Sequence, residues 1–190
     1  NPLSALSPSS LKDKFNALLE KYPDIHLIDN PYYDSFNNIA SLYVARDYIC
    51  NAIILDGDQI IYNSEILSPE FERSGYNSVW TDDETDEWLQ TVKGGIVTSC
   101  SRTGGKGGWQ LYSISRWTEE DGRKLKHFLE VEFDEKQNRQ IYWDDVAMFC
   151  HPNDFKLGIR PMNASDIIEV DNLSELIALD ESYKKYVEEK

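Results

Sequence analysis

The sequence predicts an α/β domain built on one central sheet, and three observations support this class. Residues 52–55 form a short apolar run that stops at two acids, Asp56 and Asp58, as a buried strand of an α/β sheet does. Amphipathic helical segments alternate with such runs in the first third of the chain. β-branched and aromatic residues dominate the middle. We therefore expect a single domain over residues 1–190.

The first third is expected to run helix, strand, helix, strand. Ser10 and Asp13 form a capping box before a helix over residues 11–21, which Pro23 ends. A strand follows over 25–28, then a helix over 39–46, then the strand over 52–55. This alternation favours parallel pairing in the sheet.

The middle of the chain is expected to supply most of the strands, over residues 76–80, 88–92, 95–101 and 109–117. The glycine-rich segment 102–108 contains Lys106, which suggests a phosphate loop, but its spacing is not that of a P-loop and no helix follows. A flexible hairpin tip is the favoured interpretation of this segment.

The last third is expected to contain two capped helices, a short helix and two strands. Thr118 and Asp121 cap a helix that runs to about Val131, and Asn172 and Glu175 cap the final helix. A short helix covers 146–150, and strands cover 157–160 and 167–170.

Composition excludes several functional classes. The chain has 190 residues, of which 41% are hydrophobic and 12% aromatic, so it is expected to fold around a core. A formal net charge of −15 repels phosphate backbones and argues against nucleic-acid binding. We find no membrane-spanning stretch and no signal-peptide pattern, and therefore expect a cytoplasmic protein. Three widely spaced cysteines argue against a zinc ribbon or a disulfide scaffold.

The Asp56-Gly57-Asp58 turn is a candidate site for a metal-bound nucleotide. Ligands of α/β sheets bind beyond the carboxyl ends of the strands. Mg²⁺ prefers one or two carboxylates together with substrate phosphates. A plain acidic turn after a strand explains the motif equally well.

A second acidic cluster, Tyr142-Trp143-Asp144-Asp145, sets two large rings beside two acids. One explanation is that the rings belong to the core and the acids cap the helix over 146–150. The alternative is that one acid joins Asp56 and Asp58 to hold a metal against phosphate oxygens. The rings, with Trp88 between further acids, would then hold a cationic head group.

The ordered motifs resemble a known family. Residues 30–43, the Ile-Leu-Asp-Gly-Asp of 54–58, Asp86-Glu87-Trp88, the Tyr-Trp-Asp of 142–144 and the ending 167–176 are similar to those of bacterial choline-phosphate cytidylyltransferases. These belong to the sugar-phosphate nucleotidyltransferase superfamily. The resemblance covers residues 13–186 and implies a Rossmann-like nucleotidyltransferase fold with a mixed central sheet.

The resemblance also implies roles for individual residues. Asp58 and Asp144 match the acids that bind Mg²⁺, and Asp56 is a supporting acid. Asn38 and Ser41 match positions that line the active site near the nucleotide. Trp88, Tyr142 and Trp143 match positions where choline-phosphate members carry aromatic residues that face the second substrate.

The implied reaction transfers CMP from CTP to a phosphorylated amino alcohol such as phosphocholine and releases pyrophosphate. The chain lacks the Leu-Ala-Ala-Gly-x-Gly-x-Arg loop of the family, so we expect the N-terminal strand and loop to be missing from it. Either the chain is a fragment of a longer enzyme, or a complementing N-terminal segment of a second chain supplies that loop, or the protein is a degenerate relative. A sheet truncated in this way exposes an edge, so a homo-oligomer is also expected as a partner. Two alternatives remain, namely a catalytically incomplete remnant with a binding or regulatory role and a metal-dependent glycosyltransferase.

Overall fold

The computed structural model describes residues 15, 16 and 18–186, and these fall into two compact units. One unit comprises residues 30–169, and the other comprises the described residues before 30 and after 169. The larger unit contains the sheet and all of the predicted site residues. The expectation of a single domain stays a prediction.

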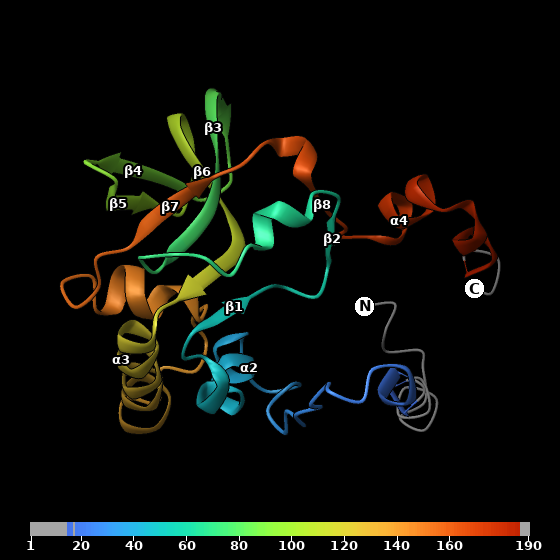
Figure 1. Ribbon diagram of the computed structural model, residues 1–190, viewed down its shortest axis with the longest axis horizontal. Helices are drawn as coiled ribbons and strands as arrows, with labels where there is room; N and C mark the ends of the chain where they lie inside the picture. Colours follow the sequence, from blue (N-terminus) through green and yellow to red (C-terminus); the bar gives the residue numbers. More distant parts are fainter. Residues whose placement is uncertain (1–14, 17, 187–190) are drawn as a thin grey trace. The chain divides into compact units, whose positions relative to one another are not determined.

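A six-stranded mixed sheet forms the centre of the larger unit (Figure 1). Five of its strands lie in the order β5-β4-β6-β3-β7, and β1 also pairs with β6. Their bounds are β1 Ala52–Ile54, β3 Gly75–Thr85, β4 Leu89–Lys93, β5 Ile96–Ser101, β6 Gly105–Trp117 and β7 Gly158–Pro161. Two further strands, β2 Gln59–Ile61 and β8 Ile167–Glu169, make a separate antiparallel pair.

The strands of the six-stranded sheet occur close to where the sequence predicts them, but their pairing differs from the expected parallel order. β1 runs antiparallel to β6, and only β3 and β7 pair in parallel among the described strands. β4 and β5 are also antiparallel, as the short turn that joins them requires. β1 is half-buried rather than fully buried, and Leu55 at its end is 41% exposed.

Three helical segments pack on one face of the sheet and enclose the main core. α2 covers Ile39–Val44, and α3 covers Glu119–Glu130 with Thr118 Oγ1 accepting a hydrogen bond from the Asp121 N–H at 3.2 Å. π-helical turns follow at Val131–Glu135 and Val146–Cys150. The core includes Tyr76, Trp117, Leu125 and Trp143, which are each at most 3% exposed.

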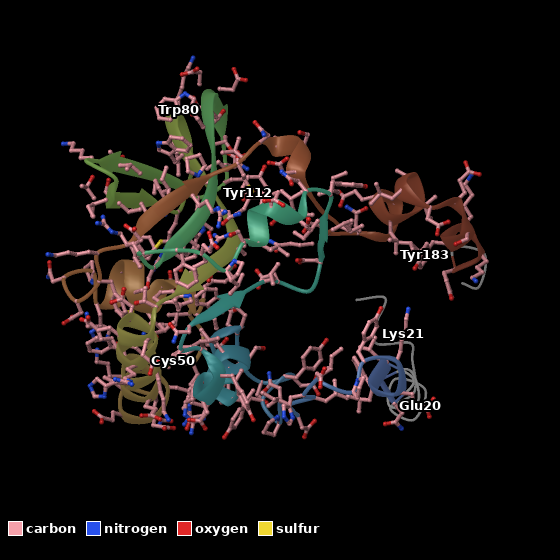
Figure 2. All side chains as sticks on the ribbon, in the orientation of Figure 1. Glu20, Lys21, Cys50, Trp80, Tyr112 and Tyr183 are labelled. Atoms are coloured by element: carbon pink, nitrogen blue, oxygen red, sulfur yellow. The ribbon has the colours of Figure 1, made fainter. Side chains whose placement is uncertain are left out.

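Two aromatic side chains form a cross-strand pair near the middle of β3. Trp80 of β3 lies directly opposite Trp109 of β6 in the strand register. Their ring centroids are 5.5 Å apart in an edge-to-face arrangement. Figure 2 shows Trp80 on the part of the sheet that lies away from α3.

The glycine-rich segment is mostly strand, so the expected flexible hairpin tip is wrong. Only residues 102–104 form a turn, and β6 begins at Gly105. β6 pairs with β3 and β4 rather than with β5, which precedes it in the chain. Gly104 has φ +69°, and a Cβ there would lie 1.7 Å from the Thr85 carbonyl oxygen, so the turn requires glycine.

The smaller unit contains α4 (Leu173–Leu179), with Asn172 Oδ1 accepting the hydrogen bond of the Glu175 N–H at 3.1 Å. The helix expected over 11–21 is helical at residues 15, 16 and 18–21, and its remaining positions lie outside the described residues. The strand expected over 25–28 is wrong. It has no partner strand among the described residues, and Leu27 is 47% exposed, so neither a ladder nor burial holds it.

None of the helices in the described part of the chain has the length and apolar character that a membrane span requires.

Candidate active site

Asp56 and Asp144, far apart in the sequence, act on each other electrostatically beside Tyr76 of β3. Asp56 follows β1, and Asp144 begins the helical turn that leads to Cys150. Burial raises the pKa of Asp56, the nearby Ser113 hydroxyl partly offsets this, and the charge of Asp58 raises it further. The two segments therefore lie close enough for Asp56 to act on Asp144, while a metal held between these acids stays a prediction.

Asp144 is the most perturbed acid of this site. Its side chain sits beside the fully buried Tyr76, and the residue is only 6% exposed. Burial raises the pKa of Asp144 to about 8, with the Tyr76 hydroxyl lowering it and the charge of Asp56 raising it further. A carboxylate held this deep without a cation is costly, so the site favours a positive partner.

Two buried oxygen atoms at this position lack hydrogen-bond partners. Asp144 Oδ1 and the Tyr76 hydroxyl are both shielded from solvent, and although the two side chains interact with each other, neither atom makes a hydrogen bond of good geometry. Buried polar atoms are almost always well paired, so Asp144 Oδ1 keeps capacity to accept a further donor or a cation. Carboxylate oxygen is the donor that Mg²⁺ prefers.

Asp58 lies further out than its neighbour. It is exposed, and its charge acts on Asp56, whose charge in turn acts on Asp144. Within the described residues, no three His, Cys, Asp or Glu side chains come together as a complete metal site. The assignment of Asp58 and Asp144 as the metal ligands stays a prediction.

Asn38 ties α2 to the second acidic cluster. Its Oδ1 accepts a hydrogen bond from the backbone N–H of Trp143 at 2.9 Å. Trp143 is 3% exposed and stacks on Tyr76 with ring centroids 6.2 Å apart. Trp143 therefore packs in the core, as the first interpretation of the cluster expected, and Asn38 positions the chain just before Asp144.

Ser41 lies on the exposed face of α2, where its hydroxyl accepts a hydrogen bond from Asn30 Nδ2 at 3.2 Å. Its place near the nucleotide stays a prediction.

Trp88 and Tyr142 form an aromatic cluster with Phe149, which sequence reasoning did not include. The Trp88 ring meets Tyr142 edge to face at 5.9 Å and Phe149 at 5.5 Å. Tyr142 is 50% exposed, so the cluster opens to solvent. Edge-to-face aromatic clusters offer ring faces to cations.

Arg102 and Asp145 complete this cluster, and sequence reasoning missed the arginine. Arg102 Nη2 lies 2.6 Å from Asp145 Oδ1, and its guanidinium carbon lies 3.9 Å from the centre of the Phe149 ring. Arg102 opens the glycine-rich segment that was expected to be a hairpin tip. The sequence did contain a signal for Arg102, because an arginine at the start of a turn that requires glycine is held in a defined position.

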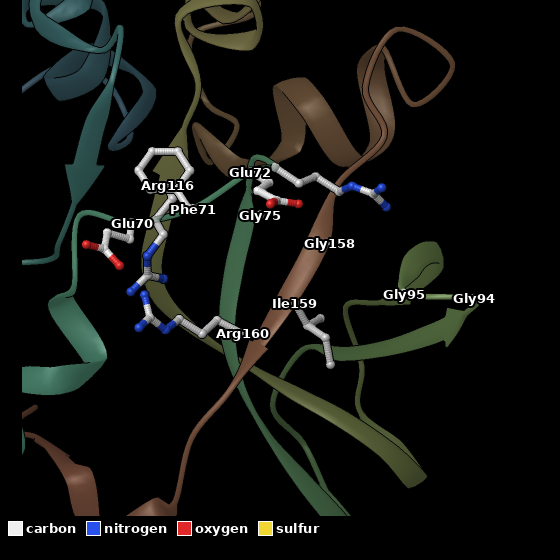
Figure 3. Close-up of a pocket in the computed structure, with 11 residues that line it drawn as sticks. Glu70, Phe71, Glu72, Gly75, Gly94, Gly95, Arg116, Gly158, Ile159 and Arg160 are labelled. Carbon is white, nitrogen blue, oxygen red and sulfur yellow. The ribbon is translucent and has the colours of Figure 1, made fainter.

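A separate cavity of about 750 Å³ lies elsewhere on the sheet (Figure 3), and it contains none of the predicted site residues. Figure 3 shows the guanidinium groups of Arg116 and Arg160 close to each other beside Glu70. Burial, followed by the charge of Arg160, lowers the pKa of Arg116 to about 10. The lining residues are Glu70, Phe71, Glu72, Arg73, Gly75, Gly94, Gly95, Arg116, Gly158, Ile159 and Arg160.

Comparison with known proteins places the chain among nucleotide-transferring enzymes, although no protein-family model matches it. It is 32% identical over 180 residues to the 2-aminoethylphosphonate cytidylyltransferase of Lancefieldella rimae, covering 91% of this chain and 71% of that protein. It is 25% identical over 174 residues to the choline-phosphate cytidylyltransferase of Streptococcus pneumoniae, covering 92% and 75%.

Solved structures agree with these relatives. The structure of the CTP:phosphocholine cytidylyltransferase of Streptococcus pneumoniae superposes with a TM-score of 0.79 at 25% identity, covering 90% of this chain and 74% of the other. The inositol-1-phosphate CTP transferase of T. maritima superposes with a TM-score of 0.64 at 10% identity, covering 93% and 73%, which supports the fold alone. The mixed sheet with flanking helices is thus the predicted Rossmann-like nucleotidyltransferase fold. With this fold and a curated relative at 32% identity, the chain belongs to the cytidylyltransferases, a family of nucleotidyltransferase enzymes.

Proposed function

We propose that this chain carries the metal and acceptor-substrate sites of a Mg²⁺-dependent enzyme that transfers CMP from CTP to a small phosphoryl or phosphonyl compound bearing an amine. Phosphocholine and 2-aminoethylphosphonate are the two model acceptors. The observation that carries the proposal is the place of Asp144, which is buried beside Tyr76 and close enough to Asp56 to feel its charge, with an Oδ1 that makes no hydrogen bond of good geometry. The two cytidylyltransferase relatives support the reaction class.

The residues of this site fit a magnesium ion. The unpaired, buried Asp144 Oδ1 supplies a hard oxygen donor, and Asp58 supplies a second carboxylate at the exposed side. Mg²⁺, when bound, neutralises phosphate charge during transfer. Asp56 would support both acids, and phosphate oxygens would complete the coordination.

The protein's own side chains would do the positioning. An attacking phosphoryl oxygen must lie in line with the bond to pyrophosphate at the α-phosphorus of CTP, so orientation and electrostatics carry most of the catalysis. Asn38 holds the backbone of Trp143 and thereby fixes where Asp144 begins its turn. Trp88 and Tyr142 would line the part of the site that faces the amine end of the acceptor.

The test uses the full-length protein as its source cell produces it, with CTP, Mg²⁺ and each acceptor, and measures CDP-linked product and pyrophosphate. Asp58→Asn and Asp144→Asn are expected to lower kcat at least about 100-fold, the range for removing a charge-stabilising group. Asp154→Asn, an exposed acid after the same helical turn, is the matched control and should be unaffected. Full activity in either site variant would overturn the metal assignment.

Calorimetry separates the enzyme from the remnant alternative. We expect CTP binding that requires Mg²⁺ in the wild type and is lost in Asp144→Asn. Binding of a nucleotide-sugar in preference to CTP would instead favour the glycosyltransferase alternative.

A further inference from the structure

Arg102 occupies the position that a cationic head group would take on the aromatic cluster of Trp88, Tyr142 and Phe149. Its guanidinium carbon lies 3.9 Å from the centre of the Phe149 ring and 5.8 Å from that of Trp88. Both distances fall within the reach of a cation–π contact. The chain thus places one of its own cations over two of the three rings.

Asp145 anchors the guanidinium there. Arg102 Nη2 lies 2.6 Å from Asp145 Oδ1, and the Asp145 side chain is only 4% exposed, whereas that of Arg102 is 47% exposed. Asp145 Oδ2 accepts the backbone N–H of Tyr142 at 3.1 Å, which fixes the carboxylate within the turn. A buried carboxylate held on both oxygens keeps its cationic partner in place.

The turn that carries Arg102 is itself constrained. Ser101 Oγ donates a hydrogen bond to the Gly104 carbonyl oxygen at 2.7 Å, and Gly104 packs against the end of β3. Arg102 is therefore presented by a tight turn between two strands, and its guanidinium cannot leave the rings without breaking the Asp145 pair.

This arrangement discriminates between two kinds of amine. A trimethylammonium group has no N–H donors and gains its affinity from aromatic faces. A primary ammonium has three donors and gains affinity from oxygen acceptors. A guanidinium over Phe149 and Trp88 covers the ring faces that a trimethylammonium group needs, whereas a primary ammonium does not depend on those faces.

We propose that Arg102 is a specificity-determining residue that makes this enzyme prefer an acceptor with a primary amine over one with a trimethylammonium group. This inference rests on the proposed cytidylyltransferase function. It names the substrate class as a primary-amine phosphonate or phosphate, with 2-aminoethylphosphonate as the model compound and phosphocholine as its competitor.

The experiment compares kcat/KM for 2-aminoethylphosphonate and phosphocholine in the full-length protein, with CTP and Mg²⁺ held saturating. We expect the wild type to favour 2-aminoethylphosphonate. Arg102→Ala uncovers the rings, and because one cation–π contact corresponds to roughly a tenfold change in affinity, the ratio should move about tenfold toward phosphocholine. Lys106→Ala, an exposed cation of the same glycine-rich segment, is the matched control and should leave the ratio unchanged.

A second variant covers the case in which Arg102→Ala fails to fold because Asp145 is left unpaired. Arg102→Lys keeps a cation beside Asp145 but lacks the planar guanidinium that covers a ring. It should move the ratio in the same direction by a smaller factor.

The outcomes separate the two proposals. If the wild type makes no CDP-linked product from either acceptor, the proposed function itself fails. If product forms but the wild type favours phosphocholine, or both variants leave the ratio within about twofold, the role of Arg102 is refuted while the proposed function stands.

Discussion

Replacing Glu132 by glutamine is expected to destabilise the protein strongly, because this carboxylate joins the two π-helical turns. Glu132 is 1% exposed. Its Oε1 accepts hydrogen bonds from Lys136 Nζ at 2.6 Å and His151 Nε2 at 2.9 Å, and its Oε2 accepts one from Asn138 Nδ2 at 2.9 Å. His151 follows the turn that Asp144 begins, so the same carboxylate holds the far end of the site segment.

The magnitude follows from these contacts. A glutamine amide retains one acceptor oxygen and turns its NH₂ toward a donor, so about two charge-assisted hydrogen bonds are lost. At 1.5–3 kcal/mol each, and with the bond from Lys136 discounted because that side chain is 52% exposed, we expect a loss of about 3 kcal/mol. For a chain of this size the melting temperature should fall by about 6–12 °C.

The pH dependence provides a second check. Burial alone raises the pKa of Glu132, but the hydrogen bonds from Lys136, Asn138 and His151 outweigh it, so the pKa lies below its usual value. Because the pKa of Glu132 is lower in the folded protein than in the unfolded chain, ionised Glu132 stabilises the fold at pH values above its unfolded-state pKa. This stabilisation is lost as the pH falls through its folded-state pKa. The wild-type advantage should be complete at about pH 7 and shrink below about pH 4.

The assay is urea unfolding followed by far-UV circular dichroism at several pH values. Glu130→Gln is the control, because that acid makes a surface ion pair with Arg46 at 3.0 Å and its loss should cost less than about 1 kcal/mol. The reasoning is refuted if Glu132→Gln costs no more than the control, or if its cost does not change with pH.

Three further substitutions test the packing of the fold, each by the same unfolding assay. Gly75→Ala should lower the free energy of unfolding by more than about 3 kcal/mol or prevent folding, because the new Cβ would lie 2.0 Å from the Gly158 carbonyl oxygen. Gly57→Ala is its control, because a Cβ there meets nothing within 4 Å and should change the free energy of unfolding by less than about 0.5 kcal/mol. Thr118→Ala removes the cap of α3 and should cost about 1 kcal/mol, and an unchanged midpoint would contradict the capping role. Leu125→Ala empties a fully buried core position and should cost about 2–5 kcal/mol, so a loss below about 1 kcal/mol would contradict its assignment to the core.

Local signals in the sequence were sufficient to predict most elements. Thr118 and Asn172 cap their helices as predicted, because a cap depends on residues three positions apart. The four central strands also lie where β-branched and aromatic residues gather. The strand expected over 25–28 failed because a strand needs a partner, and local composition carries no information about partners.

Local signals also indicated part of the candidate site. The acids at 56, 58 and 144 were identified from their place after a strand or beside rings. The contact of Arg102 with Asp145 depends on how the turn after β5 meets the start of a helix far along the chain. Such a contact follows from tertiary packing, which spacing along a single sequence does not encode.

The paired indoles of Trp80 and Trp109 provide an optical reporter of the sheet. Their edge-to-face contact joins directly opposite residues of β3 and β6, well away from the buried Trp117 and Trp143. Near-ultraviolet dichroism and fluorescence of single-tryptophan variants would therefore distinguish local opening of the β3–β6 ladder from melting of the core. The protein thus carries two internal probes, one in the more exposed part of its longest strand pair and one in the core.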